Sequence, residues 1–343
     1  MVRARSVTIR DVARDAGVAV GTVSKVLNGN GQLSNATRQR VLESVERLQY
    51  VPNAFARSLN LQRSYTVGLL TNDSFGRFSL PILLGAEDAL GMGQMSVFLC
   101  DTRDDHIREA HYIRRLLSRK VDGFIVTGRH ADARQPIDVP DGFPVVYAMT
   151  PSADPDDVSL RLDNEAGGRL AVECLLTTGR RQIAHVTGTE RHESATARYR
   201  GARAALSRAG QDGAVTDTKV LFGNWTEEWG RQAAQIIMTS APETDGICAG
   251  SDQIARGVIE GLAEFGRRVP DDVGVIGYDN WDVMVSGRRP TLSTIDPRLS
   301  ELGRRAAESL MRVIDGERLS GTQWIAPQLV IGESTRPRLP VRD

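Results

Sequence analysis

Residues 8–29 read TIRDVARDAGVAVGTVSKVLNG, and this stretch decides how the N-terminal part of the chain folds. Apolar and small side chains recur in it at helical spacing up to Gly17 and again after it. Glycine readily adopts the positive φ that a tight turn between two helices requires. Thr8, followed three residues later by Asp11, is typical of a capping-box start. The stretch therefore predicts a helix-turn-helix pair, with the second helix over Val20–Leu27.

A third helix is expected after this pair. Ser34 is a suitable N-cap for it, and the helix should stop before Pro52. Its apolar side chains are Val41, Leu42, Val45 and Leu48. We therefore expect a small all-α domain over residues 1–51, followed by a linker over residues 52–64.

Beyond residue 65 the pattern changes to apolar strands that alternate with amphipathic helices, as in parallel sheets covered by helices. Strands are expected at Thr66–Thr71, Met95–Cys100, Gly123–Thr127, Val145–Ala148, Ile183–Thr187, Val220–Phe222, Gly246–Ala249 and Val273–Gly277. Helices are expected at Leu80–Leu90, Ile107–Leu117, Asn164–Thr177, Ala197–Arg208, Thr226–Thr239 and Gln253–Phe265. The segment from residue 65 onward is too long to fold around a single hydrophobic core, so we expect two α/β lobes. The first should comprise residues 65–162 with about 292–322, and the second residues 163–291 with about 323–340.

The charges are divided unequally along the chain. The 343 residues hold 43 basic and 43 acidic side chains. Residues 1–64, called the head below, hold ten basic and four acidic ones, a net charge of +6. Residues 65–343, called the body, therefore carry −6. A basic module on a mildly acidic body favours a polyanionic partner such as nucleic acid.

Several broad classes are excluded by composition. No run of about 18 apolar residues exists, so we expect no membrane partner. The N-terminus lacks the apolar segment of a secretory signal, and we expect a cytoplasmic protein. Cys100, Cys174 and Cys248 lie far apart, and the five histidines show no ligand spacing, so no metal is expected.

Several motifs together closely resemble the lactose-repressor (LacI/GalR) family of bacterial transcription factors. In the head these are the opening stretch and YVPNAFARSL (50–59). In the body they are RRLLSRKVDGFIV (114–126), DNEAGGRLAVECLL (163–176), AHVTG (184–188), RYRGARAAL (198–206), AGSDQIARGVIEGL (249–262), VPDDVGVIGYDN (269–280) and LSTID (292–296). The resemblance implies a head that binds DNA, a hinge helix, and a two-lobed core like that of periplasmic binding proteins.

The resemblance also implies which head residues contact DNA. The second helix would present Val20, Gly21 and Lys25 to base edges in the major groove, with Thr22 and Ser24 near phosphates. Lys25 stands where the family usually has arginine, and lysine offers a flexible point charge instead of a two-pronged fork. The remaining expected DNA contacts are Thr8, Asn28, Asn53, Ala56, Arg57 and Leu59. Leu59 matches the wedge of the family's hinge helix, which unstacks base pairs in the minor groove.

Effector contacts are expected just after strands, where ligands of parallel sheets bind. The candidates are Asp73, Phe78, His192, Ser194, Arg198, Trp225, Ser251, Asp252 and Asp279. The resemblance implies that Arg198 and Asp279 bind polar groups of the effector and that Trp225 offers an aromatic face. This combination suits a sugar, although a salt bridge, a core indole and a turn-capping aspartate would also explain the three residues. Arg77 departs from the family pattern, and it either binds an anionic group or is a solvated surface arginine.

Enzyme motifs are missing from the sequence. It contains no HExxH, no P-loop, no GxSxG and no GxGxxG fingerprint, so we expect neither an enzyme nor a cofactor. We therefore predict a transcription regulator, and the family resemblance favours a repressor over an activator. As a homodimer it would bind a palindromic operator under the control of a sugar-like effector. The alternative is a solute-binding protein that carries a sugar without any role on DNA, and a sugar-processing enzyme is a third option.

Overall fold

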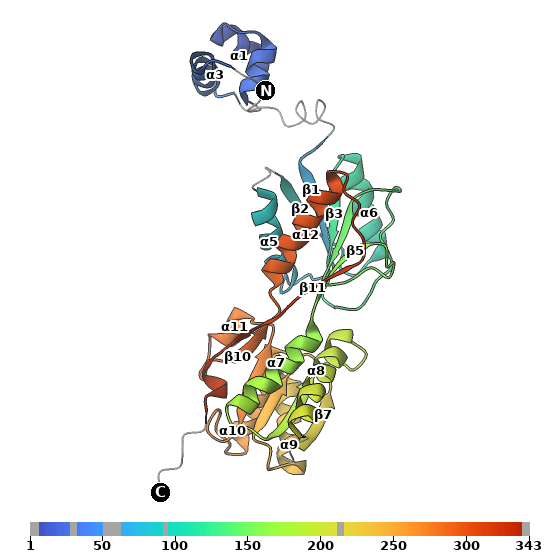
Figure 1. The fold of residues 1–343 in the computed structure, drawn as a ribbon, viewed down its shortest axis with the longest axis vertical. Coiled ribbons are helices and arrows are strands. Elements are labelled where there is room, and N and C mark those ends of the chain that lie inside the picture. The colour runs from blue at the N-terminus through green and yellow to red at the C-terminus, as the bar shows by residue number, and fades with distance from the viewer. Residues whose placement is uncertain (1–6, 28–32, 51–62, 92–94, 211–215, 338–343) are drawn as a thin grey trace, which may run out of the picture. The chain divides into compact units, whose positions relative to one another are not determined.

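The computed structural model describes residues 7–27, 33–50, 63–91, 95–210 and 216–337. The chain consists of two compact units, the head (Met1–Ser64) and the body (Tyr65–Asp343). The head contains α1 (Ile9–Ala16), α2 (Val20–Leu27) and α3 (Asn35–Arg47), so the three predicted helices are confirmed (Figure 1). None of the helices among these residues is long and apolar enough to span a membrane.

Local signals in the sequence define the ends of the head helices. The Asp11 carboxylate accepts hydrogen bonds from the backbone N–H and the hydroxyl of Thr8, at 3.0 and 2.7 Å, and so caps α1. Gly17 ends that helix with φ 65°, in the left-handed region. The Ser34 hydroxyl oxygen accepts a hydrogen bond from the N–H of Thr37 at 3.2 Å and caps α3. These short-range bonds explain why the helix boundaries could be predicted.

The inner face of α3 differs from the prediction at one position. Leu42 was expected in the apolar face, but 46% of its surface is exposed, while Ser44 is fully buried. The Ser44 hydroxyl donates to the Asp15 carboxylate at 2.6 Å, and Arg47 donates to the same carboxylate at 2.6 Å. These two hydrogen bonds hold the pKa of Asp15 below its usual range. A buried serine is tolerated here because its hydroxyl has a partner on α1.

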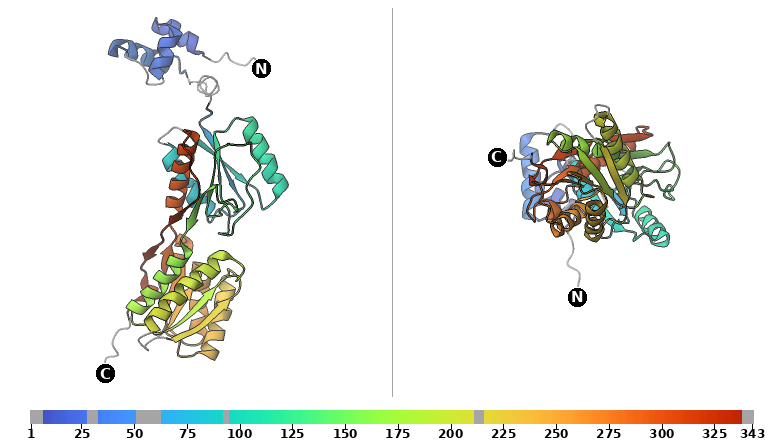
Figure 2. Two further views of the ribbon diagram at one scale, coloured as in Figure 1. Left: turned by 45° about the vertical axis from the view of Figure 1, so that its right-hand side comes forward. Right: turned by 90° about the horizontal axis from the view of Figure 1, so that it is seen from below.

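The first lobe of the body is a six-stranded parallel sheet of order β11-β5-β4-β3-β1-β2. Its strands are β1 (Thr66–Thr71), β2 (Ser96–Asp101), β3 (Gly123–Val126), β4 (Val145–Ala148), β5 (Val158–Leu162) and β11 (Thr322–Ile325). Helices α5 (Ser79–Gly91), α6 (His106–Ser118) and α12 (Leu299–Ile314) flank it on both faces (Figure 2). Val67, Leu69 and Ile125 lie at the centre of its core.

The second lobe repeats this architecture with the order β12-β10-β9-β8-β6-β7. Its strands are β6 (Gln182–Thr187), β7 (Thr216–Phe222), β8 (Gly246–Ala249), β9 (Gly274–Tyr278), β10 (Ser293–Asp296) and β12 (Gln328–Val330). Its helices are α7 (Asn164–Thr177), α8 (Glu193–Gly210), α9 (Glu227–Ser240), α10 (Asp252–Glu264), α11 (Asp282–Val285) and a 3₁₀ turn at Glu333–Thr335. Strand β12 runs antiparallel to β10, and the other pairings are parallel.

The segments that cross between the lobes lie a few residues from where we expected them. Strand β10 pairs with β9, so the chain leaves the second lobe after Asp296 and not near residue 292. Strand β11 pairs with β5, so residues 323–325 belong to the first lobe. Strands β5, β10, β11 and β12 and helix α12 were not expected as elements. Each of the four strands contains polar residues, unlike the short apolar strands that were predicted, so no apolar run marks them.

Helices α5 and α12 pack backbone against backbone in the first lobe. A Cβ atom on Gly85 would lie 1.9 Å from the carbonyl oxygen of Ser300, and one on Gly303 would lie 2.0 Å from that of Ile82. Only glycine fits at these two positions. This close contact holds α5 against α12, and the loop of residues 72–78 that precedes α5 contributes to the site described next.

Candidate functional site

A cavity of about 560 Å³ lies between the lobes, where the carboxyl ends of strands from both sheets meet. It is lined by Asp73, Phe75, Arg77, Phe78, Arg129, His130, Ala131, Met149, Leu162, Asn164, Ser194, Arg198, Trp225, Gln253, Asp279, Trp281, Pro297 and Leu299. Six of the nine effector candidates are on its wall, namely Asp73, Phe78, Ser194, Arg198, Trp225 and Asp279. The cavity combines aromatic faces with a few charged groups, as small-molecule sites commonly do.

Arg198 is held in place by its own lobe. Its Nε donates to the side-chain oxygen of Asn164 at 2.9 Å, and its Nη1 donates to the carbonyl oxygen of Gly250. The guanidinium carbon lies 3.5 Å from the centre of the Tyr278 ring, a close cation–π contact. The side chain is 8% exposed and is therefore oriented before any ligand arrives.

Asp279 follows β9 in a backbone conformation that is uncommon for a non-glycine residue, with φ 104°. Its N–H donates to the carbonyl oxygen of Ile295 at 2.9 Å, which holds the turn in place. The carboxylate, 6% exposed, accepts a short hydrogen bond from Arg77 and lies 3.7 Å from Nη2 of Arg198. One carboxylate thus serves two guanidinium groups, one from each lobe.

Arg77 joins the two lobes. It comes from the loop between β1 and α5, and its guanidinium donates to the Asp279 carboxylate and, at 2.7 Å, to the Gln253 side chain. The guanidinium also lies 4.7 Å from the centre of the Trp281 ring. The interpretation as a solvated surface arginine is therefore wrong, since the side chain is 15% exposed and both of its terminal nitrogens bind groups across the cleft.

Trp225 and His192 form a hydrogen-bonded pair of rings. The indole Nε1 donates to Nδ1 of His192 at 2.9 Å, and the two ring planes are inclined by 7°. Trp225 lines the cavity, whereas His192, which was also expected there, is not among the lining residues. His130 of the first lobe faces His192, with 4.3 Å between ring centres. Burial lowers the pKa of His130, and the neighbouring His192 lowers it further.

Ser251 and Asp252 do not line the cavity, contrary to the prediction. The Ser251 hydroxyl oxygen accepts from the N–H of Ile254 at 3.3 Å and caps α10. The Asp252 carboxylate accepts from the N–H of Trp281 at 2.7 Å and from the hydroxyl of Thr294 at 2.6 Å. Burial, with the negative charge of Asp279, raises the pKa of Asp252 to about 8. Both residues support the wall, because the start of α10 turns them toward the sheet.

Asp73 lines the cavity and also has a structural task. One oxygen of its carboxylate accepts from the N–H groups of Phe78 and Ser79, at 2.7 and 2.9 Å, which caps the first turn of α5. Sequence reasoning missed several other wall residues, among them Arg129, His130, Asn164, Gln253 and Trp281. Arg129 and His130 follow the third predicted strand, so the rule that placed the other candidates could have found them.

The head presents a separate surface on α2. Val20, Gly21 and Lys25 are exposed, while Val23 and Val26 are buried against α1 and α3. Thr22 and Ser24 are half-buried, and Thr8 is exposed at the start of α1. Asn28, Asn53, Ala56, Arg57 and Leu59, together with the expected hinge helix, lie outside the described residues.

Comparisons with known proteins agree for both units. Residues 8–53 match the bacterial regulatory proteins of the lacI family, and residues 172–335 match the periplasmic binding protein-like domain. Catabolite control protein A of Priestia megaterium is 32% identical over 318 residues, which cover 91% of this chain and 94% of that protein. The transcriptional regulator CelR in complex with cellobiose is 30% identical with a TM-score of 0.66, covering 96% of this chain and 99% of that one.

The dimeric lac repressor bound to its operator and the anti-inducer ONPF is 26% identical, with a TM-score of 0.75 and coverage of 97% of this chain and 100% of that one. The match of residues 8–53 argues against a solute carrier, because such a carrier would share only the body. The chain belongs to the lacI family of bacterial regulatory proteins, which are DNA-binding transcription regulators and not enzymes.

Proposed function

We propose that this protein is a homodimeric repressor whose binding to a palindromic operator is controlled by a sugar in the cleft between the lobes. The observation that carries the proposal is the arrangement of Arg198, Asp279 and Trp225 around one cavity. The guanidinium and the carboxylate provide a donor and an acceptor for hydroxyl groups, and the indole provides a flat apolar face. A sugar ring has both kinds of surface.

Trp281 extends this arrangement. Its ring lies on the same cavity wall, and its backbone N–H is fixed by Asp252. Two indoles and two phenyl rings around a few charged groups favour a neutral carbohydrate over a highly charged ligand. Each guanidinium of the wall already has a carboxylate nearby, since Arg129 pairs with Asp104 at 3.4 Å and Arg77 with Asp279. The related regulator CelR binds cellobiose in its solved complex, which agrees with this class of ligand.

DNA binding is assigned to the head. Its net charge of +6 favours phosphate contacts, and the exposed side of α2 offers Val20, Gly21 and Lys25 to base edges. Leu59 remains our proposed minor-groove wedge by resemblance alone. A homodimer would place two heads on the half-sites of a palindrome, as in the lac repressor dimer on its operator. We place the protein in the cytoplasm, because bacterial operator DNA lies there.

The cleft also suggests how the effector acts. The Arg77 contacts with Asp279 and Gln253 join the lobes directly. Sugar hydroxyls that bind Asp279 would compete with Arg77 for the same carboxylate and so change the balance between open and closed bodies. An effector can shift this balance only by its difference in affinity for the two states.

A thermal-shift screen of the full chain against neutral sugars, with cellobiose and ribose included, tests the effector assignment. A sugar at about 100 times its dissociation constant adds about 2.7 kcal/mol of stability. The shift should disappear in Asp279→Ala and persist in Asp271→Ala, which removes an exposed aspartate. A sugar that stabilises both variants equally would place the binding site elsewhere.

Gel-shift experiments on palindromic operator DNA test the regulatory assignment. The affinity should fall steeply with salt, because a basic head releases counterions when it binds phosphates. The sugar found in the screen should change the operator affinity of the native protein and leave that of Asp279→Ala unchanged. Binding to all DNA sequences with equal affinity would contradict the proposal.

A further inference from the structure

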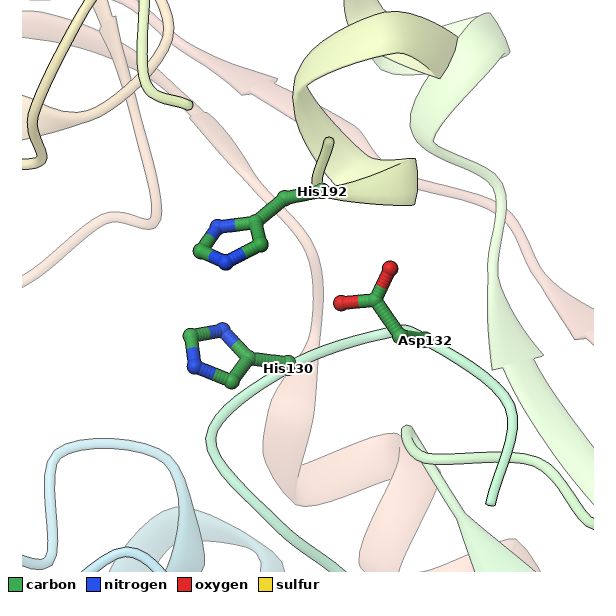
Figure 3. Close-up of side chains that lie close together, drawn as sticks. All are labelled: His130, Asp132 and His192. Atoms are coloured by element: carbon green, nitrogen blue, oxygen red, sulfur yellow. The ribbon is translucent and has the colours of Figure 1, made fainter. Parts of the chain in front are cut away.

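Two histidines and an aspartate meet at the junction of the lobes (Figure 3). His130 and Asp132 lie on the segment after β3 in the first lobe, and His192 precedes α8 in the second. One nitrogen from each ring and one carboxylate oxygen lie within 4.8 Å of one another. Among the described residues, no other group of three histidine, cysteine, aspartate or glutamate side chains has ligand atoms this close together. All three are partly buried, so solvent separates them less than it would on an open surface.

We propose that His130, Asp132 and His192 bind one divalent transition-metal ion of the zinc class across the two lobes. Two imidazole nitrogens and one carboxylate oxygen form a donor set that zinc uses, whereas calcium and magnesium prefer oxygen ligands alone. Tetrahedral zinc with bonds of about 2.1 Å places its ligand atoms about 3.4 Å apart. The three ligand atoms lie within 4.8 Å of one another, so small side-chain rotations bring them to that spacing. A fourth position stays open to water or to a ligand hydroxyl, because His130 also lines the cavity.

A hydrogen bond between the lobes already orients two of the ligands. One carboxylate oxygen of Asp132 accepts a hydrogen bond from the backbone N–H of Glu193 at 2.9 Å. Glu193 directly follows His192, so this bond holds Asp132 beside the histidine of the other lobe. Since the ligands come from both lobes, a bound ion links the lobes in the arrangement of this structure and stabilises that arrangement. This consequence does not depend on which effector fills the cavity.

Binding of the ion must compete with the hydrogen bond between Trp225 and His192. A neutral imidazole has one N–H, and His192 accepts from the Trp225 indole at Nδ1, so its proton is on Nε2. The metal needs the lone pair of Nε2. A neutral imidazole that binds a metal through Nε2 has its N–H on Nδ1. The Nδ1–H then faces the indole N–H, and their hydrogen bond breaks. Because Trp225 lines the cavity, the ion and the effector are coupled, and the coupling is reciprocal.

Zinc titration of the untagged full-length chain, stripped with a chelator and free of DNA and sugar, tests the site. The experiment uses a His106→Ala, His111→Ala, Cys100→Ser background, which removes two exposed histidines and a half-buried thiol that could bind zinc on their own. Calorimetry should show one ion per chain with micromolar affinity. Cobalt should give the visible absorption of a tetrahedral site with nitrogen and oxygen ligands.

Variants of the ligands provide the decisive comparison. His130→Ala, His192→Ala and Asp132→Asn should each weaken zinc binding by more than about tenfold. Trp225→Phe should tighten it several-fold, because the competing hydrogen bond is gone. Circular dichroism confirms that each variant is folded. Zinc binding that survives both histidine substitutions, an unchanged affinity in Trp225→Phe, or no saturable binding at all would overturn the proposal. A failure to bind any sugar, with zinc binding intact, would contradict the proposed effector and leave the metal site supported.

Discussion

The head and the cleft present their chemistry in opposite ways. On the head, the candidate side chains are neighbours on one helix, α2, and several of them are exposed, with Val20 at 41%. In the cleft, they come from the ends of many segments and are already bonded within the protein, as Arg198 is to Asn164 and Gly250. A change on the head should therefore alter binding with little effect on folding. A change in the cleft should affect binding and stability together.

The largest difference is expected for Arg198→Met. The substitution leaves Asn164 and the Gly250 carbonyl without their donor and removes one cation from Asp279. Breaking a buried charged contact costs about 3–5 kcal/mol. Arg200→Met is the matched control on the same helix, because Arg200 is 55% exposed and its ion pairs are at the surface. It should cost less than about 1 kcal/mol. Urea unfolding of both variants measures the contrast, and equal losses would contradict a preorganised Arg198.

A smaller effect, specific to the body, concerns pH. All five histidines lie in the body, and burial, with the positive charge of Arg198, lowers the pKa of His185 to about 4. As the pH falls through about 6.5, His185 binds a proton in the unfolded chain but stays neutral in the folded protein. The contribution of His185 is therefore complete at neutral pH and is lost as the pH falls toward 4.

Between pH 7 and pH 5 this histidine should cost the native protein about 2 kcal/mol of unfolding free energy. His185→Leu should remove this loss, because leucine does not titrate and neither ring nitrogen has a hydrogen-bond partner within the described residues. Denaturant unfolding at the two pH values gives the difference between variant and native protein. An identical pH dependence in both would show that His185 is not buried in its neutral form.

On the head, Lys25→Ala should weaken specific operator binding by about tenfold, the value of one base contact of about 1–3 kcal/mol. Effector binding and the melting temperature of the body should stay unchanged. Lys25→Arg keeps the charge but supplies a fork, so it should retain nonspecific affinity and alter sequence preference. Gel shifts on operator and scrambled DNA separate the two effects. A drop in effector affinity would contradict the division between the units.

The smallest effect is expected within the head core. Ser44→Ala removes the hydrogen bond to Asp15 and should cost about 1 kcal/mol of head stability. Leu42→Ala, on the exposed side of the same helix, should change it by less than about 0.5 kcal/mol. Amide hydrogen exchange over residues 9–47 measures both. A larger cost for Leu42 would indicate that another surface covers it.

Prediction from the sequence succeeded where short-range signals decide the structure. The two helices around Gly17 and the cap at Ser34 depend on residues within a few positions, and both are confirmed. It failed at Leu42 and Ser44, because the side of α3 that is buried depends on how α1 packs against it. Ser251 and Asp252 were misplaced for a similar reason, since the rule about strand ends does not say which side chains of a helix start face the cavity.

Local patterns along the chain were enough to identify the family, the three head helices, the alternating strands and helices, and the positions after strands where ligand contacts are expected. Each of these depends on local periodicity, caps or motifs. The tertiary structure alone decided that Arg77 binds Asp279, 202 positions away, and that His192 meets His130. These contacts arise because two separate sheets bring their carboxyl ends to one cleft. No spacing along the chain encodes which loops meet there.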